Sequence, residues 1–343
     1  MGETSAHRGV TQSKYVVYNV HAYQIPHNNS IKSFPDTLLN LKFPSFSPPP
    51  KPNPPPWRTN PEATTTDDAD AMAFSPKGKV VVVTGGANGI GAALCHRFAA
   101  EGASRVVVVD LHAGSASSVA EALPGGVGAA IGANCGVEMD LRRVILQTEF
   151  EHGPIDVFCA NAGIPSNGSF DVPNDEWERI WRVNAMQHVW VARYLFPKWI
   201  ERGSGYLVVT ASAAGLLSQV GSLPYTVTKH ASVAMAEWLA ITYASKGIQV
   251  SCLCPQAVAT GMLPDGTGGM AGNDGVLQAE DVVQELMLAM CEGRFLVTPH
   301  KNVLTYVQRK AADHGRWLRG MQRQHAKFGE LTLNAPNLTA AKL

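Results

Sequence analysis

A tyrosine and a lysine, Tyr225 and Lys229, are the side chains whose types and spacing best suit proton transfer. The chain runs from Tyr225 to Lys246 without glycine or proline, which predicts a helix on which residues four apart share one face. A free phenol has a pKa of about 10, and a nearby ammonium lowers that pKa by favouring the phenolate. Such a pair also arises by chance on exposed helices, so its meaning depends on what surrounds it.

Two further polar side chains could serve the same chemistry. Ser212 follows an apolar run over residues 206–210, so we expect it where a strand ends, and its hydroxyl could hold a carbonyl or alcohol oxygen beside the tyrosine. Asn184 lies within a helical stretch over about residues 175–202. An amide there is either a satisfied core group or a group that holds a water, and the helix pattern alone favours the core amide.

A glycine-rich segment, residues 84–91, separates a run of β-branched residues from a helical pattern. The run over residues 79–83 predicts a strand that is buried on both faces. Backbone N–H groups at a helix N-terminus attract a pyrophosphate, and glycine lets the backbone turn tightly beside it. The segment therefore predicts a dinucleotide-binding loop, with contributions from Gly85, Asn88, Gly89, Ile90 and Gly91.

An aspartate, Asp110, ends a second run of valines after this loop. A carboxylate about 20 residues after the glycines can accept hydrogen bonds from the adenosine ribose hydroxyls, and it repels a 2′-phosphate. Neither Asn88 nor the residues after Asp110, Leu111 and His112, supply a lysine or arginine to bind that phosphate. The sequence therefore predicts that NAD is preferred over NADP.

Strands and helices alternate along the chain, which predicts a parallel sheet with helices on both faces. A further strand is expected over residues 154–160, and the motif Asn161-Ala162-Gly163 follows it. Ligands of such sheets bind at the carboxyl ends of the strands. The predicted fold class is α/β, a single-domain Rossmann-type doubly wound parallel sheet flanked by helices, with its dehydrogenase domain over residues 76–300.

These motifs and their order resemble the short-chain dehydrogenase/reductase family, of the classical type, over about residues 77–260. The resemblance implies four catalytic positions, Asn184, Ser212, Tyr225 and Lys229. It also implies that Asn161, Ala162 and Gly163 stabilise the central sheet beside the cofactor. A segment that wraps the nicotinamide would contribute Pro255, Val258 and Thr260.

The family mechanism assigns a role to each catalytic residue. The resemblance implies that Tyr225 is the general base in alcohol oxidation, or the general acid in ketone reduction. Lys229 would lower the pKa of Tyr225 and bind the nicotinamide ribose, and Ser212 would hold the substrate oxygen. Asn184, through its backbone, would fix a water that relays protons to Lys229. The family also implies a homodimer or homotetramer.

Two positions depart from the family pattern. Where the family has an aspartate in the turn after the third strand, this chain is expected to place Gly136, so one adenine contact would be lost. Where the family has Pro-Gly, this chain has Pro255-Gln256. The Gln256 side chain would either shape the pocket or point to solvent.

A glycine-rich segment near residues 262–275 is expected to form a substrate lid. Apolar residues there and after Ser212 predict an apolar pocket, or else they only pack the lid; they are Met262, Leu263, Met270, Leu216, Leu217 and Val220. A pocket of this kind suits a hydrophobic secondary alcohol or ketone that is steroid-, prostaglandin- or terpenoid-like. The alternatives are an NADPH-dependent ketone reductase and a non-catalytic nucleotide-sensing protein.

The composition excludes several other classes of protein. The 343 residues carry a formal net charge of +0, which gives no reason to expect nucleic acid as a partner. No apolar run reaches the roughly 18 residues of a transmembrane helix. The six cysteines lie in apolar segments without zinc-binding spacing, so we expect reduced, buried thiols and no metal site.

Residues 1–75 and 301–343 flank this domain. The first segment holds a polyproline II stretch over residues 47–56 and no apolar period, so we predict a disordered extension. It is a dispensable tail, a plastid or mitochondrial transit peptide, or a segment upstream of a start at Met72, and the expected location is otherwise cytoplasmic. The C-terminal tail shows one basic amphipathic helical pattern over residues 302–328. That pattern suits packing on the protein itself or on a partner subunit more than binding to a membrane surface.

Overall fold

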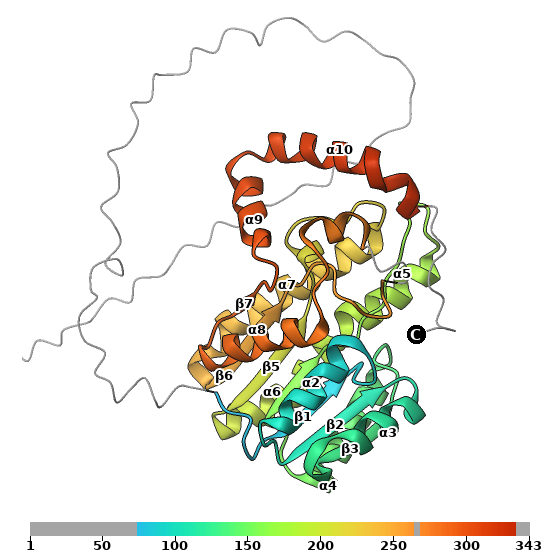
Figure 1. The fold of residues 1–343 in the computed structure, drawn as a ribbon. Helices are drawn as coiled ribbons and strands as arrows, with labels where there is room; N and C mark the ends of the chain where they lie inside the picture. The colour runs from blue at the N-terminus through green and yellow to red at the C-terminus, as the bar shows by residue number, and fades with distance from the viewer. Residues whose placement is uncertain (1–73, 264–267, 334–343) are drawn as a thin grey trace, which may run out of the picture. The chain divides into compact units, whose positions relative to one another are not determined.

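The computed structural model describes residues 74–263 and 268–333, and Figure 1 shows their arrangement. The predictions made for residues 1–73 lie outside the described residues, as does the middle of the predicted lid. Within the described part, seven parallel strands form one sheet in the order β3-β2-β1-β4-β5-β6-β7. The strand order reverses direction between β1 and β4. In open sheets of this type a ligand site forms at that point.

The strands are short and, in the middle of the sheet, fully buried. They are β1 (Val80–Thr84), β2 (Arg105–Asp110), β3 (Gly128–Gly132), β4 (Val157–Ala160), β5 (Gly205–Thr210), β6 (Ile248–Leu253) and β7 (Leu296–Val297). Runs of valine suit this position, because branched side chains pack well on both faces of a covered sheet. The first, second and fourth strands lie where the sequence predicts them.

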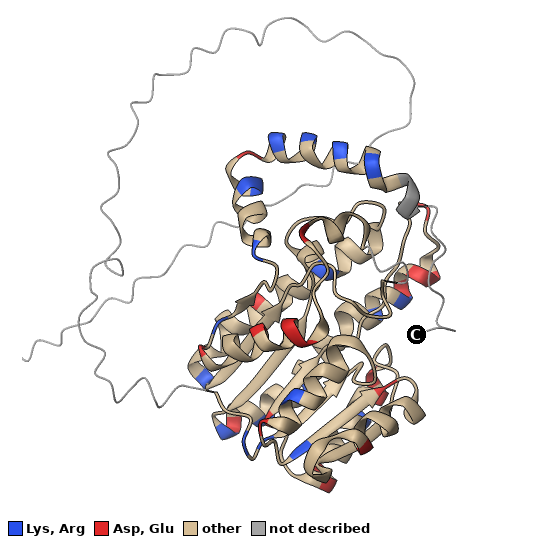
Figure 2. Cartoon of the chain, in the orientation of Figure 1, with Lys and Arg blue, Asp and Glu red and all other residues tan. Residues whose placement is uncertain are grey.

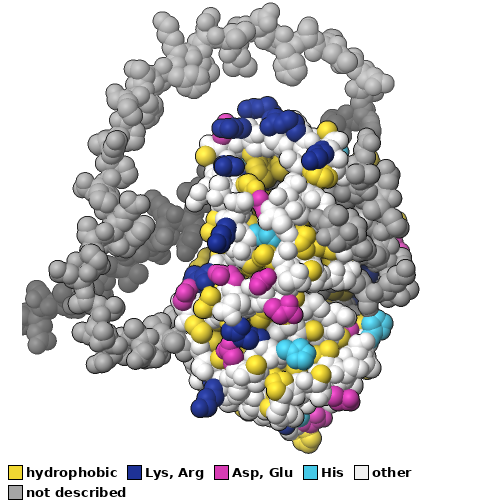
Figure 3. Space-filling view, viewed as in Figure 1, with side chains coloured by type: hydrophobic (Ala, Val, Ile, Leu, Met, Phe, Trp, Pro, Cys, Tyr) yellow, Lys and Arg dark blue, Asp and Glu magenta, His cyan; other side chains and the backbone are white. Residues whose placement is uncertain are grey.

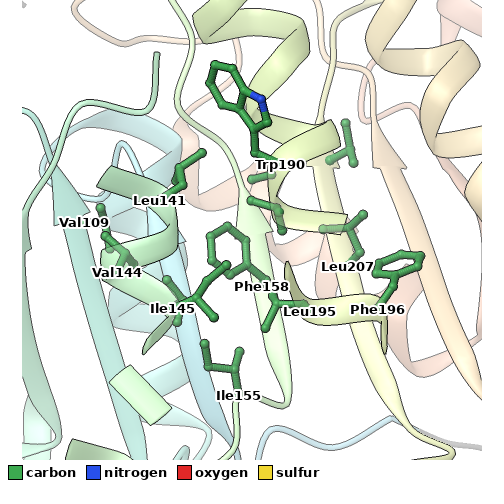
Figure 4. Packing of buried hydrophobic residues seen from close by; sticks show 14 of the residues in the cluster. Val109, Leu141, Val144, Ile145, Ile155, Phe158, Trp190, Leu195, Phe196 and Leu207 are labelled. Atoms are coloured by element: carbon green, nitrogen blue, oxygen red, sulfur yellow. The ribbon is translucent and has the colours of Figure 1, made fainter. Parts of the chain in front are cut away.

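Helices cover both faces of the sheet. One face packs on α4 (Glu138–His152), α6 (Gln187–Arg202) and α7 (Leu223–Tyr243), and the other packs on α2 (Gly89–Ala100), α3 (Ala113–Ala122) and α8 (Ala279–Cys291). Alternate residues of one strand serve the two cores, Val82 the first and Val83 the second. Figure 4 shows Phe158 among side chains of the first core. The predicted doubly wound fold is confirmed.

The helical stretch predicted around Asn184 contains a widened turn. It consists of α5 (Asn174–Trp181), a π-turn (Arg182–Met186) and then α6. Turns of this kind often occur at functional sites because they displace one residue from the regular helix. Asn184 lies in the turn and is fully buried.

The C-terminal segment forms two helices, not the single one that its pattern predicts. They are α9 (Asn302–Ala312) and α10 (His314–Leu333), and they meet at Asp313, whose backbone is extended. The Asp313 carboxylate accepts a hydrogen bond from the Arg316 backbone N–H at 2.8 Å. An aspartate in this position caps the start of a new helix, and this capping accounts for the break.

Short 3₁₀ turns complete the described chain: η2 (Pro124–Gly126), η4 (Ala213–Gly215), η5 (Ala244–Lys246) and η6 (Gly269–Asp274). All six cysteines are free thiols, and five are buried as predicted, but Cys291 is exposed. Among the described residues, no helix is both long enough and apolar enough to cross a bilayer.

Candidate active site

One cavity of about 1080 Å³ lies at the carboxyl ends of the strands. It is lined by the glycine loop, by Asp110 and by the segment from Ser212 to Lys229. Of the residues predicted for catalysis or cofactor binding, only Gly91 and Asn184 do not line it. The fold therefore brings segments up to 175 residues apart in the chain, from Gly85 to Thr260, to a single site.

The glycine loop depends on the absence of side chains. Gly85 and Gly89 have φ angles of +62° and +50°, which favour glycine. A Cβ atom on Gly89 would lie 2.7 Å from Thr260, and one on Gly91 would lie 1.9 Å from the Gly85 carbonyl oxygen. The loop thus packs against its own helix and against the 255–260 segment, and the space that it leaves open fits a dinucleotide pyrophosphate.

The Asn161-Ala162-Gly163 motif joins two strand ends. The Asn161 side chain donates a hydrogen bond to the Thr84 carbonyl at 3.0 Å. The Thr84 hydroxyl accepts hydrogen bonds from the backbone N–H groups of Asn161 and Ala162 at 2.9 and 3.0 Å. These bonds hold the end of β4 against the glycine loop at the point where the strand order reverses.

Asp110 supports the loop from the end of β2. One of its carboxylate oxygens accepts a hydrogen bond from the Ala87 N–H at 3.1 Å, and the other accepts one from the His112 N–H at 3.2 Å. Each oxygen keeps a free lone pair on the cavity side. The fixed carboxylate is therefore available to ribose hydroxyls.

The turn after β3 contains Gly136, the position at which the loss of an adenine contact is expected. Gly136 does not line the cavity, whereas Asn134, at the same end of the sheet as Asp110, does. The Gly136 N–H donates a hydrogen bond to the Asn134 side-chain oxygen at 2.9 Å. Asn134 is thus a residue of this turn that lines the cavity and also fixes the backbone at Gly136.

Ser212 and Tyr225 both line the cavity, and their side chains interact. Ser212 begins the turn η4, where its hydroxyl accepts a hydrogen bond from the Ala214 N–H at 3.1 Å and lies 3.4 Å from the Pro255 carbonyl. Tyr225 is in the first turn of α7, and the Lys229 ammonium lies 5.6 Å from the centre of its ring. Helix α7 therefore brings Tyr225 and Lys229 to the cavity together, and Ser212 reaches the same cavity from the start of η4.

Burial dominates the electrostatics of this group. It raises the pKa of Tyr225 above its ordinary value, and the interaction with Ser212 offsets this only in part. Burial also lowers the pKa of Lys229 to about 8, although Nζ donates a hydrogen bond to the Thr210 carbonyl at 2.9 Å. That Lys229 lowers the pKa of Tyr225 stays a prediction, and burial is the largest influence on the pKa of Tyr225 in this structure.

Asn184 lies behind the lysine. Its amide exchanges two hydrogen bonds with the Ile164 backbone, at 2.9 and 3.0 Å. Its backbone carbonyl accepts a hydrogen bond from the Ser232 hydroxyl at 2.8 Å. The side chain is therefore a satisfied core amide.

His300 is a residue of the site that sequence reasoning missed. It is buried, and its Nδ1 accepts a hydrogen bond from the Gln256 backbone N–H at 3.1 Å. Burial lowers the pKa of His300, so the ring is neutral and its other nitrogen, Nε2, donates to the Ala257 carbonyl at 3.1 Å. The imidazole thus fixes the backbone of the segment that the family resemblance places at the nicotinamide. Gln256 itself lines the cavity.

The far end of the cavity is closed by η6 and by the C-terminal helices. Asp274 of η6 accepts hydrogen bonds from the Asn302 amide and the Tyr306 hydroxyl, both at 2.8 Å, which ties the predicted lid to α9. The apolar residues predicted for the pocket divide into two groups. Leu217, Met262, Leu263 and Met270 line the cavity, whereas Leu216 and Val220 do not, and Leu216 packs against the first core.

Comparisons with known proteins identify the family to which this chain belongs. The family model of the short chain dehydrogenases matches residues 79–267. The 1-deoxy-11-beta-hydroxypentalenate dehydrogenase of Streptomyces exfoliatus is 36% identical over 228 residues, which are 63% of this chain and 81% of that protein. The meso-2,3-butanediol dehydrogenase of Serratia marcescens is 32% identical over 185 residues, which are 54% of this chain and 73% of that protein.

A solved structure of a short chain dehydrogenase/reductase has a similar fold. A short chain dehydrogenase/reductase from Burkholderia phymatum, in complex with NAD, superposes with a TM-score of 0.65 at 25% identity. The match covers 70% of this chain and 95% of that one. The similarity therefore extends over nearly the whole of a smaller protein.

Proposed function

Because the chain belongs to the short-chain dehydrogenase family, and is thus an oxidoreductase that acts on CH–OH groups, we propose that it transfers a hydride between NAD(H) and a hydrophobic secondary alcohol or ketone. The observation that carries the proposal is the cavity shared by the glycine loop and by Ser212, Tyr225 and Lys229. A dinucleotide and a substrate oxygen would meet there.

The nucleotide half fits NAD. The glycine loop would hold the pyrophosphate, Asp110 the adenosine ribose and Asn134 the adenine. A carboxylate whose oxygens both hold backbone N–H groups is a fixed negative charge, which disfavours a 2′-phosphate. Lys229, with a pKa of about 8, would bind the nicotinamide ribose hydroxyls.

The proton chemistry belongs to Tyr225. A bound nicotinamide would supply the hydride acceptor for oxidation of an alcohol, and Tyr225 would accept the hydroxyl proton. Ser212, whose side chain interacts with that of Tyr225, would orient the alcohol oxygen. The proton could then leave past Lys229 through a water on the Asn184 carbonyl. Ketone reduction uses the same residues with the tyrosine as acid.

The substrate half supports a bulky apolar substrate. Leu217, Met262 and Met270 line it, and α9 and α10 extend the cavity beyond the catalytic group. Methionine side chains adapt to irregular apolar shapes. Steroid-, prostaglandin- or terpenoid-like alcohols match this wall.

The helix that carries Tyr225 also offers an apolar outer surface. Trp238 and Ile241 of α7 are 58% and 77% exposed. Large apolar side chains grouped on one helix favour burial against a second copy of the chain, so we propose a homodimer or homotetramer that uses this helix. Light scattering of the wild type and of Ile241→Lys tests the assembly: a smaller particle is expected for the variant.

Cofactor binding tests the central proposal. Quenching of tryptophan fluorescence by NADH and NADPH should show at least tenfold tighter binding of NADH, because Asp110 disfavours the 2′-phosphate. The variant Asp110→Asn should reduce that preference, since it keeps the shape of the residue and removes its charge. Tighter NADPH binding by the wild type would favour a ketone reductase. If the protein bound neither nucleotide, the dehydrogenase proposal would be wrong and a non-catalytic role would be favoured.

A further inference from the structure

Three arginines line the end of the cavity that α9 and α10 close. Arg309 belongs to α9, and Arg316 and Arg323 belong to α10. Because Arg316 and Arg323 are seven residues apart, two helical turns, they lie on one side of α10. Figure 2 shows lysine and arginine along both helices, and Figure 3 shows basic side chains gathered over them.

These three arginines lack the ion pairs that several other arginines of the described residues make. None of the three forms an ion pair with a carboxylate of the described chain, whereas other arginines pair with acids within 4 Å: Arg97, Arg179, Arg193, Arg202 and Arg294. The acids at this end of the cavity are engaged elsewhere. Asp274 accepts from Asn302 and Tyr306, and Asp313 caps α10.

The neighbouring wall is apolar. Trp317 and Met321, between the arginines on α10, also line the cavity, and both are half-buried. Arg309 lies over the Tyr306 ring at 6.0 Å, a contact that keeps its guanidinium beside the cavity without neutralising it. An apolar wall with unpaired guanidinium groups at its edge matches a ligand with an apolar body and an anionic end.

We propose that the cavity accepts an amphipathic anion, an apolar alcohol or ketone whose carboxylate, sulfate or phosphate group binds Arg309, Arg316 and Arg323. Guanidinium groups bind such anions through paired, charge-assisted hydrogen bonds. The proposal rests on the proposed function only for the reacting end of the molecule, at Ser212 and Tyr225. The anionic end follows from the arginines themselves.

Other basic residues of these helices have different surroundings. Lys310 donates hydrogen bonds to the Leu216 and Leu217 carbonyls at 2.9 and 3.3 Å, which fastens α9 to the segment after Ser212. Arg319 and Lys327 of α10 do not line the cavity. A membrane surface would engage all exposed cations of α10, whereas a ligand in the cavity engages only those that line it. This difference provides a matched control.

The test uses two fluorescent probes that share one apolar body, 8-anilinonaphthalene-1-sulfonate and its neutral analogue N-phenyl-1-naphthylamine. They are titrated into the full chain, into the triple variant Arg309→Gln, Arg316→Gln and Arg323→Gln, and into the control Arg319→Gln. The triple variant should bind the sulfonate at least about tenfold more weakly, because it loses the charge-assisted hydrogen bonds to the anionic group. Its affinity for the neutral probe, and the affinity of the control for both, should change less than about twofold.

Three results would overturn the proposal. Equal sulfonate affinity in the triple variant and the wild type would show that the arginines bind no anion. Equal weakening of both probes would show that they only pack the wall. Binding to phosphatidylserine vesicles is measured for the same variants. If Arg319→Gln and the triple variant lost vesicle binding equally, and both kept the sulfonate affinity of the wild type, the basic side chains would belong to a membrane-binding surface. None of these binding measurements depends on turnover. A negative result would therefore overturn the anion proposal without bearing on the dehydrogenase proposal.

Discussion

The two ends of the cavity are built from different parts of the chain and by different means. At the nucleotide end, the contacts are made by backbone groups and by short side chains at strand ends, such as Thr84, Asp110 and Asn161. At the substrate end, side chains of η6 and α9 are hydrogen-bonded to each other, and side chains of α10 complete the wall of the cavity. Backbone geometry follows a local sequence motif, whereas an assembly of side chains depends on segments that only the fold brings together.

The catalytic tyrosine lies between the two ends, and its removal should have the largest effect. Tyr225→Phe should lower turnover by at least about a thousandfold, because it removes the only proposed proton acceptor at the substrate oxygen. NADH affinity should change less than about twofold, since the hydroxyl faces Ser212. Steady-state rates with a secondary alcohol, and fluorescence titration of NADH, measure the two quantities.

The matched control is the other phenol that lines the cavity. Tyr306→Phe removes a hydroxyl that binds Asp274, so it should retain most of the turnover. A comparable loss of turnover in Tyr225→Phe and Tyr306→Phe would contradict the catalytic role of Tyr225.

The second largest effect should come from the backbone of the nucleotide end. In Gly91→Ala, the new Cβ would lie 1.9 Å from the Gly85 carbonyl oxygen, so the glycine loop must move. We expect NADH affinity to fall by about a hundredfold, because the pyrophosphate site consists of that backbone. The substitution Gly114→Ala in α3, where a Cβ meets nothing within 4 Å, should leave affinity unchanged. Unchanged affinity in Gly91→Ala would contradict the placement of the pyrophosphate.

The same contrast between local and distant contacts decides what the sequence can predict. The β1 strand, the glycine loop and the Tyr225–Lys229 helix are predictable because each depends on residues close in sequence. The role of His300 is not, because its partners Gln256 and Ala257 lie more than 40 residues away. The pKa of Tyr225 is not predictable either, because it is set by burial that the whole fold creates.

Other misses had local causes. Asp313 ends one helix and caps the next, yet the apolar period continues across it and therefore predicts a single helix. Asn134 lines the cavity although no sequence motif singled it out, because only the fold of the turn decides which of its side chains reaches the cavity.

Burial of Lys229 at the nucleotide side should be measurable as a cost in stability. Its pKa is lowered to about 8, so between pH 8 and its ordinary value near 10.5 the unfolded chain binds more protons and folding stability rises with pH. The variant Lys229→Met lacks this titration. From pH 7 to pH 10.5, the free energy of unfolding of the wild type should therefore rise relative to that of the variant. The expected relative gain is up to about 3 kcal/mol.

Urea unfolding at the two pH values measures this shift. The lost hydrogen bond to the Thr210 carbonyl affects both pH values equally, so only the change in the difference reports on the charge. A difference that stays constant with pH would show that Lys229 is not desolvated.

The smallest effect should come from the link between η6 and α9. Asp274→Ala removes the acceptor that holds the Asn302 amide and the Tyr306 hydroxyl, so α9 should open more often, by about 1–2 kcal/mol. Hydrogen exchange of the α9 amides should accelerate, and the KM for the alcohol should rise by up to about tenfold, while NADH affinity stays unchanged. The variant Asp274→Asn keeps one side-chain oxygen as acceptor and should recover most of the protection. If NADH affinity fell with α9 protection, the two ends of the cavity would be coupled, and the division between a backbone-built nucleotide end and a side-chain-built substrate end would fail.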